Sequence, residues 1–71
     1  MDEKKIISII SKALKTKINA KSTIYNTQQW DSLGHLSILS ALQKATKGKS
    51  SKIDLTEAQS IKDLTLKLKK L

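Results

Sequence analysis

The spacing of apolar positions along the chain predicts three main helices. In each predicted helix, apolar residues recur three or four places apart: Ile6, Ile7, Ile10 and Leu14 in residues 3–15; Leu33, Leu36, Leu39 and Leu42 in residues 32–46; and Ile61, Leu64, Leu68 and Leu71 in the last segment. This spacing places the residues of each set on one face of an α-helix. The pattern therefore predicts an all-α protein whose helices bury these faces against one another.

Polar connections separate the predicted helices. Residues 16–30 are rich in turn-forming residues, but Ile18, Ile24 and Trp30 interrupt them, and we expect these three side chains to hold a long loop against the helices. A single Trp among apolar neighbours is expected to be a packing anchor rather than a stacking platform for a base. Residues 47–53 combine Lys, Ser and Gly, which is typical of a flexible and exposed linker.

A short helix is predicted before the last one. Asp54 is followed three residues later by Glu57, which is the pattern of a capping box, and predicts a helix over residues 55–59. Ser60 and Asp63 repeat the pattern and mark the start of the last helix. The predicted fold is a small all-α bundle with three main helices, one short helix before the last and a long first loop. It forms one domain over residues 1–71, with four helices in all.

The composition excludes several kinds of site. The chain has 71 residues with no Cys and one His, so disulfides, thiolate sites and multi-histidine metal sites are excluded. No apolar run approaches the ~20 residues that span a bilayer, so we expect no transmembrane segment. The first residues mix charges ahead of an apolar run too short for a signal peptide. We therefore expect a cytoplasmic, monomeric protein.

The net charge of +8 is carried entirely by Lys, because the chain contains no Arg. A basic excess favours nucleic acid, an anionic membrane or an acidic protein as partner. Base-specific recognition favours the bidentate guanidinium group of Arg, so no specific nucleic-acid partner is expected. One interpretation of the chain is accordingly a Lys-rich helical module that binds nucleic acid, an anionic membrane or a protein partner without specificity.

Asp31 and Ser32 directly precede the apolar pattern of the second predicted helix. Both residue types are favoured at helix starts, so the Ser32 hydroxyl should lie at the beginning of this helix and face water. The simplest interpretation is a helix cap and nothing more. A catalytic Ser32–His35 pair would need an orienting third group and an oxyanion site, which the chain does not offer, so no enzymatic activity is expected. His35 is expected to be solvated or to contact a partner.

Asp31-Ser32-Leu33, followed by a leucine-rich amphipathic helix, resembles the attachment motif of acyl and peptidyl carrier proteins. The resemblance covers nearly the whole chain, including the long first loop and the short helix before the last. It implies that a phosphopantetheinyl transferase attaches 4′-phosphopantetheine from coenzyme A to Ser32, with Asp31 helping to present the serine and Leu33 flanking the arm. The arm would carry an acyl or aminoacyl thioester to loading and processing enzymes, as in fatty acid biosynthesis. The cargo stays open among a fatty acid, a polyketide unit, an amino acid and D-alanine.

Two features depart from the family pattern. Trp30 occupies a position where the family often has Gly, and the second predicted helix contains no Asp or Glu after Asp31. We therefore expect docking through Leu33, His35 and Leu36, with partner enzymes that present acidic surfaces. Gly34 weakens the first helical turn by up to ~1 kcal/mol relative to Ala. It either admits the arm or the modifying enzyme, or is simply tolerated.

Overall fold

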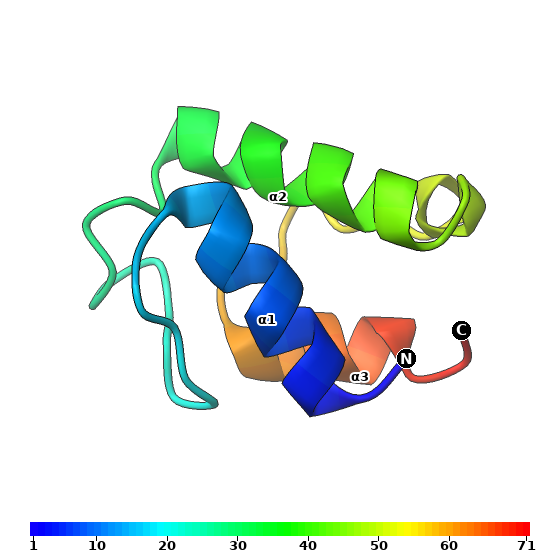
Figure 1. Cartoon of the computed structure of the whole chain (residues 1–71), viewed down its shortest axis with the longest axis horizontal. Coiled ribbons are helices and arrows are strands. Elements are labelled where there is room, and N and C mark those ends of the chain that lie inside the picture. Colours follow the sequence, from blue (N-terminus) through cyan, green and yellow to red (C-terminus); the bar gives the residue numbers. More distant parts are fainter.

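A computed structural model describes all residues 1–71. The chain forms three α-helices and one 3-10 helix: α1 (Glu3–Leu14), α2 (Ser32–Ala45), η1 (Lys49–Lys52) and α3 (Ile61–Leu68). In Figure 1, α2 runs along the top, α3 lies below it, and α1 crosses obliquely and packs against both. The predicted all-α fold with a short extra helix before the last helix is confirmed. None of the helices is both long enough and apolar enough to cross a membrane.

The first helix starts and ends as its sequence predicts. The Asp2 carboxylate accepts a hydrogen bond from the backbone N–H of Lys5 at 2.9 Å and caps the start. At the other end Lys15 adopts a left-handed conformation with φ 55°, and the N–H of Thr16 donates to the carbonyl of Ser11. This arrangement satisfies a carbonyl that has no helical partner.

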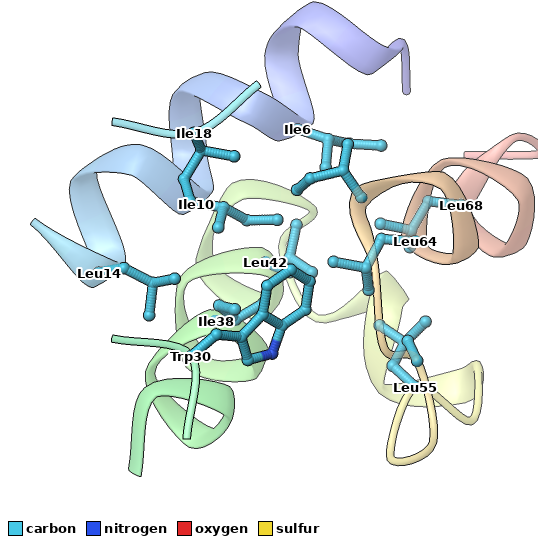
Figure 2. Packing of buried hydrophobic residues seen from close by; sticks show 12 residues of the cluster. Ile6, Ile10, Leu14, Ile18, Trp30, Ile38, Leu42, Leu55, Leu64 and Leu68 are labelled. Atoms are coloured by element: carbon cyan, nitrogen blue, oxygen red, sulfur yellow. The ribbon is translucent and has the colours of Figure 1, made fainter. Parts of the chain in front are cut away.

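A single aliphatic core joins the helices, the long loop and the segment before α3. Figure 2 shows side chains from all of these elements pointing toward one another around the Trp30 indole. Seven side chains of this core have no measurable exposure: Ile6, Ile10, Ile38, Leu42, Ile61, Leu64 and Leu68. In a chain without disulfides, burial of these groups is the main source of stability.

The long loop, residues 15–31, is held in place by buried side chains and by backbone hydrogen bonds. Ile18 and Trp30 are buried and Ile24 is partly buried, as expected for anchors. The N–H of Ile24 also donates to the carbonyl of Gln59, and the N–H of Ile61 donates to the carbonyl of Ser22. These two backbone bonds, which the sequence did not predict, tie the loop to the segment that precedes α3.

The predicted helix over residues 55–59 is wrong in position. Asp54 accepts hydrogen bonds from the backbone N–H and the hydroxyl of Thr56, two residues ahead, and so forms an Asx-turn instead of a cap. The short helix is instead η1, in the segment expected to be a flexible, exposed linker. There Ser50 is buried and its N–H donates to the Thr46 hydroxyl. With three α-helices and a 3-10 turn, the structure is not a four-helix bundle.

Candidate functional site at the start of α2

Asp31, and not Ser32, caps the second helix. Asp31 is extended, and its carboxylate accepts from the N–H of Gly34 at 2.8 Å, while its carbonyl accepts from the N–H of His35 at 2.8 Å. The helix therefore begins at Ser32. The cap interpretation accounts for Asp31 and gives no role to the Ser32 hydroxyl.

Ser32 is exposed at the first helical position, as predicted. The N–H groups of Ser32 and Leu33 precede the first helical hydrogen bonds and are available to a ligand, because the cap uses only the N–H of Gly34. The partial positive charge of a helix start adds to the attraction for an anion. An anion linked to the Ser32 oxygen would therefore lie where the backbone favours it.

Gly34 is required by packing within the chain. A Cβ atom at this position would lie 2.1 Å from the carbonyl oxygen of Gln29 and 3.1 Å from Cδ2 of Leu14. Both neighbours belong to the protein itself, so the close approach that this glycine allows is between α2, the end of the long loop and α1. This contact fixes the direction in which α2 leaves the loop.

His35 connects three segments of the chain through both ring nitrogens. The Trp30 indole N–H donates to Nδ1 of His35 at 3.0 Å, and Nε2 lies 3.0 Å from the carbonyl oxygen of Leu55. Because an indole nitrogen can only donate, Nδ1 must be the acceptor and Nε2 must carry the proton. The rings of Trp30 and His35 also stack, with centroids 6.3 Å apart. His35 is therefore an internal bridge with a half-buried side chain, and its expected contact with a partner stays a prediction.

Leu33 and Leu36 point outward from α2. Their exposed fractions are 76% and 62%, whereas Ile38 and Leu42 are fully buried. The predicted apolar face of this helix is thus rotated: the buried side is centred on Ile38 and Leu42, and the two leucines nearest Ser32 lie on the surface. The apolar pattern alone could not separate them because leucines occur on both sides of the helix.

An open groove of about 1040 Å³ runs beside Ser32, between α2 and the segment before α3. Its apolar lining consists of Ile24, Trp30, Leu36, Leu39 and Ala58. Its polar lining consists of Asp31, Ser32, His35, Thr56, Glu57 and Gln59. The groove thus brings together the predicted residues Asp31, Ser32, His35 and Leu36. It also includes residues 56–59, which no pattern in the sequence places near Ser32.

The arrangement of side chains around Ser32 limits the chemistry that this site can perform. Both nitrogens of His35 are occupied within the chain, so this ring is not placed to take a proton from Ser32. No group of three or more His, Asp or Glu side chains is arranged to hold a metal ion. What the site offers is one exposed hydroxyl at a helix start, two exposed leucines and a partly apolar groove.

Comparisons of the chain with protein-family models, with curated proteins and with solved structures find no match. The assignment of a function therefore depends on the geometry at the start of α2.

Proposed function

We propose that the protein is an acyl carrier protein that holds an acyl or aminoacyl group on a 4′-phosphopantetheine arm attached to Ser32. The observation that carries the proposal is the Ser32 hydroxyl, which is exposed at the first position of α2 and relieved of capping by Asp31. The groove beside it gives an attached arm a surface on which to lie.

The residues present fit such a group. The phosphodiester of the arm would be an anion at a helix start, where the N–H groups of Ser32 and Leu33 and the helix dipole favour negative charge. When bound, the arm supplies the thiol that this cysteine-free chain lacks, and that thiol holds the cargo as a thioester. Tethering raises the effective concentration of the cargo at each partner enzyme.

The attachment reaction is carried out by a phosphopantetheinyl transferase. The Ser32 oxygen forms a bond to the phosphorus atom that bears the pantetheine in coenzyme A, and the pyrophosphate bond of coenzyme A breaks. Adenosine 3′,5′-bisphosphate leaves with the bonding electron pair, and a base of the transferase accepts the hydroxyl proton. This protein contributes the position of the hydroxyl, so it acts as the substrate and not as the enzyme.

Docking of partners would use the exposed leucines beside Ser32. Leu33 and Leu36 form an apolar surface next to the hydroxyl, and α2 carries no carboxylate after the capping Asp31. The chain has a net charge of +8, so partner enzymes with acidic surfaces would be attracted to it over long range.

Incubation with coenzyme A and a broad-specificity transferase tests the proposal. Intact mass should increase by one phosphopantetheinyl group, and Ser32→Ala should abolish the increase. Ser37→Ala is the matched control, because Ser37 is also an exposed serine of α2.

Asp31→Asn keeps a good helix cap and removes the charge, so slower modification of a stably folded Asp31→Asn protein would assign the carboxylate a role in presenting Ser32 to the transferase. An adduct on another residue, or no adduct, contradicts the proposal.

A second candidate is binding of an anionic surface through lysines at the far end of α2. Lys5, Lys47 and Lys49 line an open hollow together with Met1 and Leu71. This hollow lies where the two termini meet, away from Ser32 by the length of α2, about 21 Å at 1.5 Å per residue (Figure 1). Under this alternative, binding to anionic vesicles or to DNA weakens steeply with salt and is unaffected by Ser32→Ala.

A further inference from the structure

The hydrogen bond between Trp30 and His35 requires a neutral histidine ring. Nδ1 accepts from the indole N–H at 3.0 Å and Nε2 donates to the Leu55 carbonyl at 3.0 Å, so the neutral ring uses its one lone pair and its one N–H. An imidazolium has an N–H on each nitrogen and no acceptor. Protonation therefore sets two donors, Nδ1–H and the indole N–H, against each other, so the Trp30 bond is lost while the Leu55 bond can remain.

The two rings differ in their access to solvent. Trp30 is 3% exposed, whereas the His35 side chain is half-buried. Both rings line the groove beside Ser32, so a proton from the solvent can reach His35 and the imidazole has open space to turn into. The indole stays in the packed interior, where an N–H without a partner is costly. The contact therefore has a closed arrangement with neutral His35 and an open one with protonated His35.

The charged groups that share the groove with His35 are both acidic. Asp31 lines it from the cap of α2 and Glu57 from the segment before α3, whereas the long loop adds two uncharged residues. Neither α1 nor α3 contributes a residue, and no lysine lines the groove. Asp54, next to Leu55, accepts hydrogen bonds from Thr56 and lines a different hollow. A cationic His35 ring that turns into the groove therefore meets negative charge only, which stabilises the open arrangement.

We propose that the Trp30–His35 pair is a proton-sensitive latch for the groove beside Ser32. Neutral His35 holds the indole and keeps the floor of the groove closed. Protonation breaks the bond between the two rings, and the imidazolium turns into the groove. Histidine side chains ordinarily change charge between about pH 5 and pH 8, so the latch responds to mild acidification. The proposal does not depend on the attachment of an arm to Ser32, because both states belong to the unmodified chain.

NMR spectroscopy of the unmodified protein tests the latch directly. The chain has one Trp and one His, so the signals of both rings are unambiguous. A hydrogen bond between two nitrogens gives a scalar coupling between them, and the coupling of Trp30 Nε1 to His35 Nδ1 should be present at about pH 8 and absent at about pH 5. The protection of the indole N–H against hydrogen exchange, relative to free indole at the same pH, should fall by about 5- to 150-fold over this range.

Two variants separate the latch from other titrating groups. His35→Gln keeps an acceptor and a donor in one side chain but cannot take up a proton in this range, so the protection of the indole N–H should not change with pH. Glu57→Gln is the matched control, because it removes a carboxylate of the groove and keeps the latch, so the loss of protection at low pH should persist.

Three results would overturn the proposal. The first is a coupling and a protection of the indole N–H that are unchanged at about pH 5. The second is an equal loss of protection in His35→Gln, which would assign the effect to another group. The third is an equal loss of protection at the core amides of α1 and α2, which would indicate general unfolding in acid. None of these results bears on the modification of Ser32, so the latch and the proposed function can fail separately.

Discussion

The bridge made by His35 predicts a defined loss of stability in His35→Ala. The substitution removes the acceptor of the buried Trp30 N–H and the donor to the Leu55 carbonyl. An unpaired buried donor costs about 1–3 kcal/mol. The higher helix propensity of Ala returns at most ~0.7 kcal/mol, so the net loss should be about 0.3–2.3 kcal/mol. The upper end of this range is a large share of the ~3–5 kcal/mol that the core of so small a chain supplies.

Urea unfolding followed by helical circular dichroism measures this loss. With a slope of ~1 kcal/mol per M, the midpoint should fall by about 0.3–2.3 M. A double-mutant cycle with Trp30→Phe, which removes the donor but keeps an aromatic ring, isolates the hydrogen bond. Since the pair is in direct contact, the two losses should be non-additive by about 0.5–1.5 kcal/mol. Additive losses, or a His35→Ala midpoint equal to that of the wild type, would refute the assignment of His35 as a bridge.

Three further predictions concern stability at two backbone positions, Gly34 and Lys47, and the pKa of Asp54. Gly34→Ala should lower stability in the same urea assay, because overpacking against the Gln29 carbonyl costs about 1–3 kcal/mol and exceeds the ~1 kcal/mol gain in helix propensity; a more stable variant would contradict the close contact. Lys47→Gly should raise stability by up to about 1 kcal/mol, since Lys47 has φ 55° at the end of α2, and an unchanged melting temperature would argue against that conformation. Hydrogen bonds from the hydroxyl and the N–H of Thr56 lower the pKa of Asp54, so its contribution to stability is present above about pH 4 and is lost as the pH falls through the lowered value. An NMR titration should show this low pKa rising toward the ordinary value in Thr56→Val, which removes the hydroxyl but keeps the N–H, and an unchanged pKa would rule out the hydroxyl hydrogen bond.

The positions of the main helices follow closely from the sequence. Helix α1 ends one residue before the predicted boundary, and α2 starts at Ser32 and also ends one residue early. These boundaries are determined locally, by Asp2 and Asp31 as caps and by the spacing of the buried residues. Local interactions of this kind are visible in a single sequence.

The features that the sequence did not predict depend either on contacts between distant segments or on competition between alternative local hydrogen bonds. Asp54 was expected to cap a helix, but its bonds to Thr56 favour a turn. The inward position of His35 depends on Trp30 and on Leu55, which is 20 residues away. The groove likewise requires residues 56–59 to lie against α2, and no local pattern in that segment indicates this. Side-chain exposure at Leu33 and Leu36 follows from which face of α2 meets α1.

The most direct test of the account is peptide mass mapping of the protein isolated from the cells that make it. The peptide that contains Ser32 should carry a phosphopantetheinyl group, and peptides with the other serines of α2 should be unmodified. Recovery of the Ser32 peptide only in its unmodified form would contradict the claim that this hydroxyl is the attachment point of a carrier.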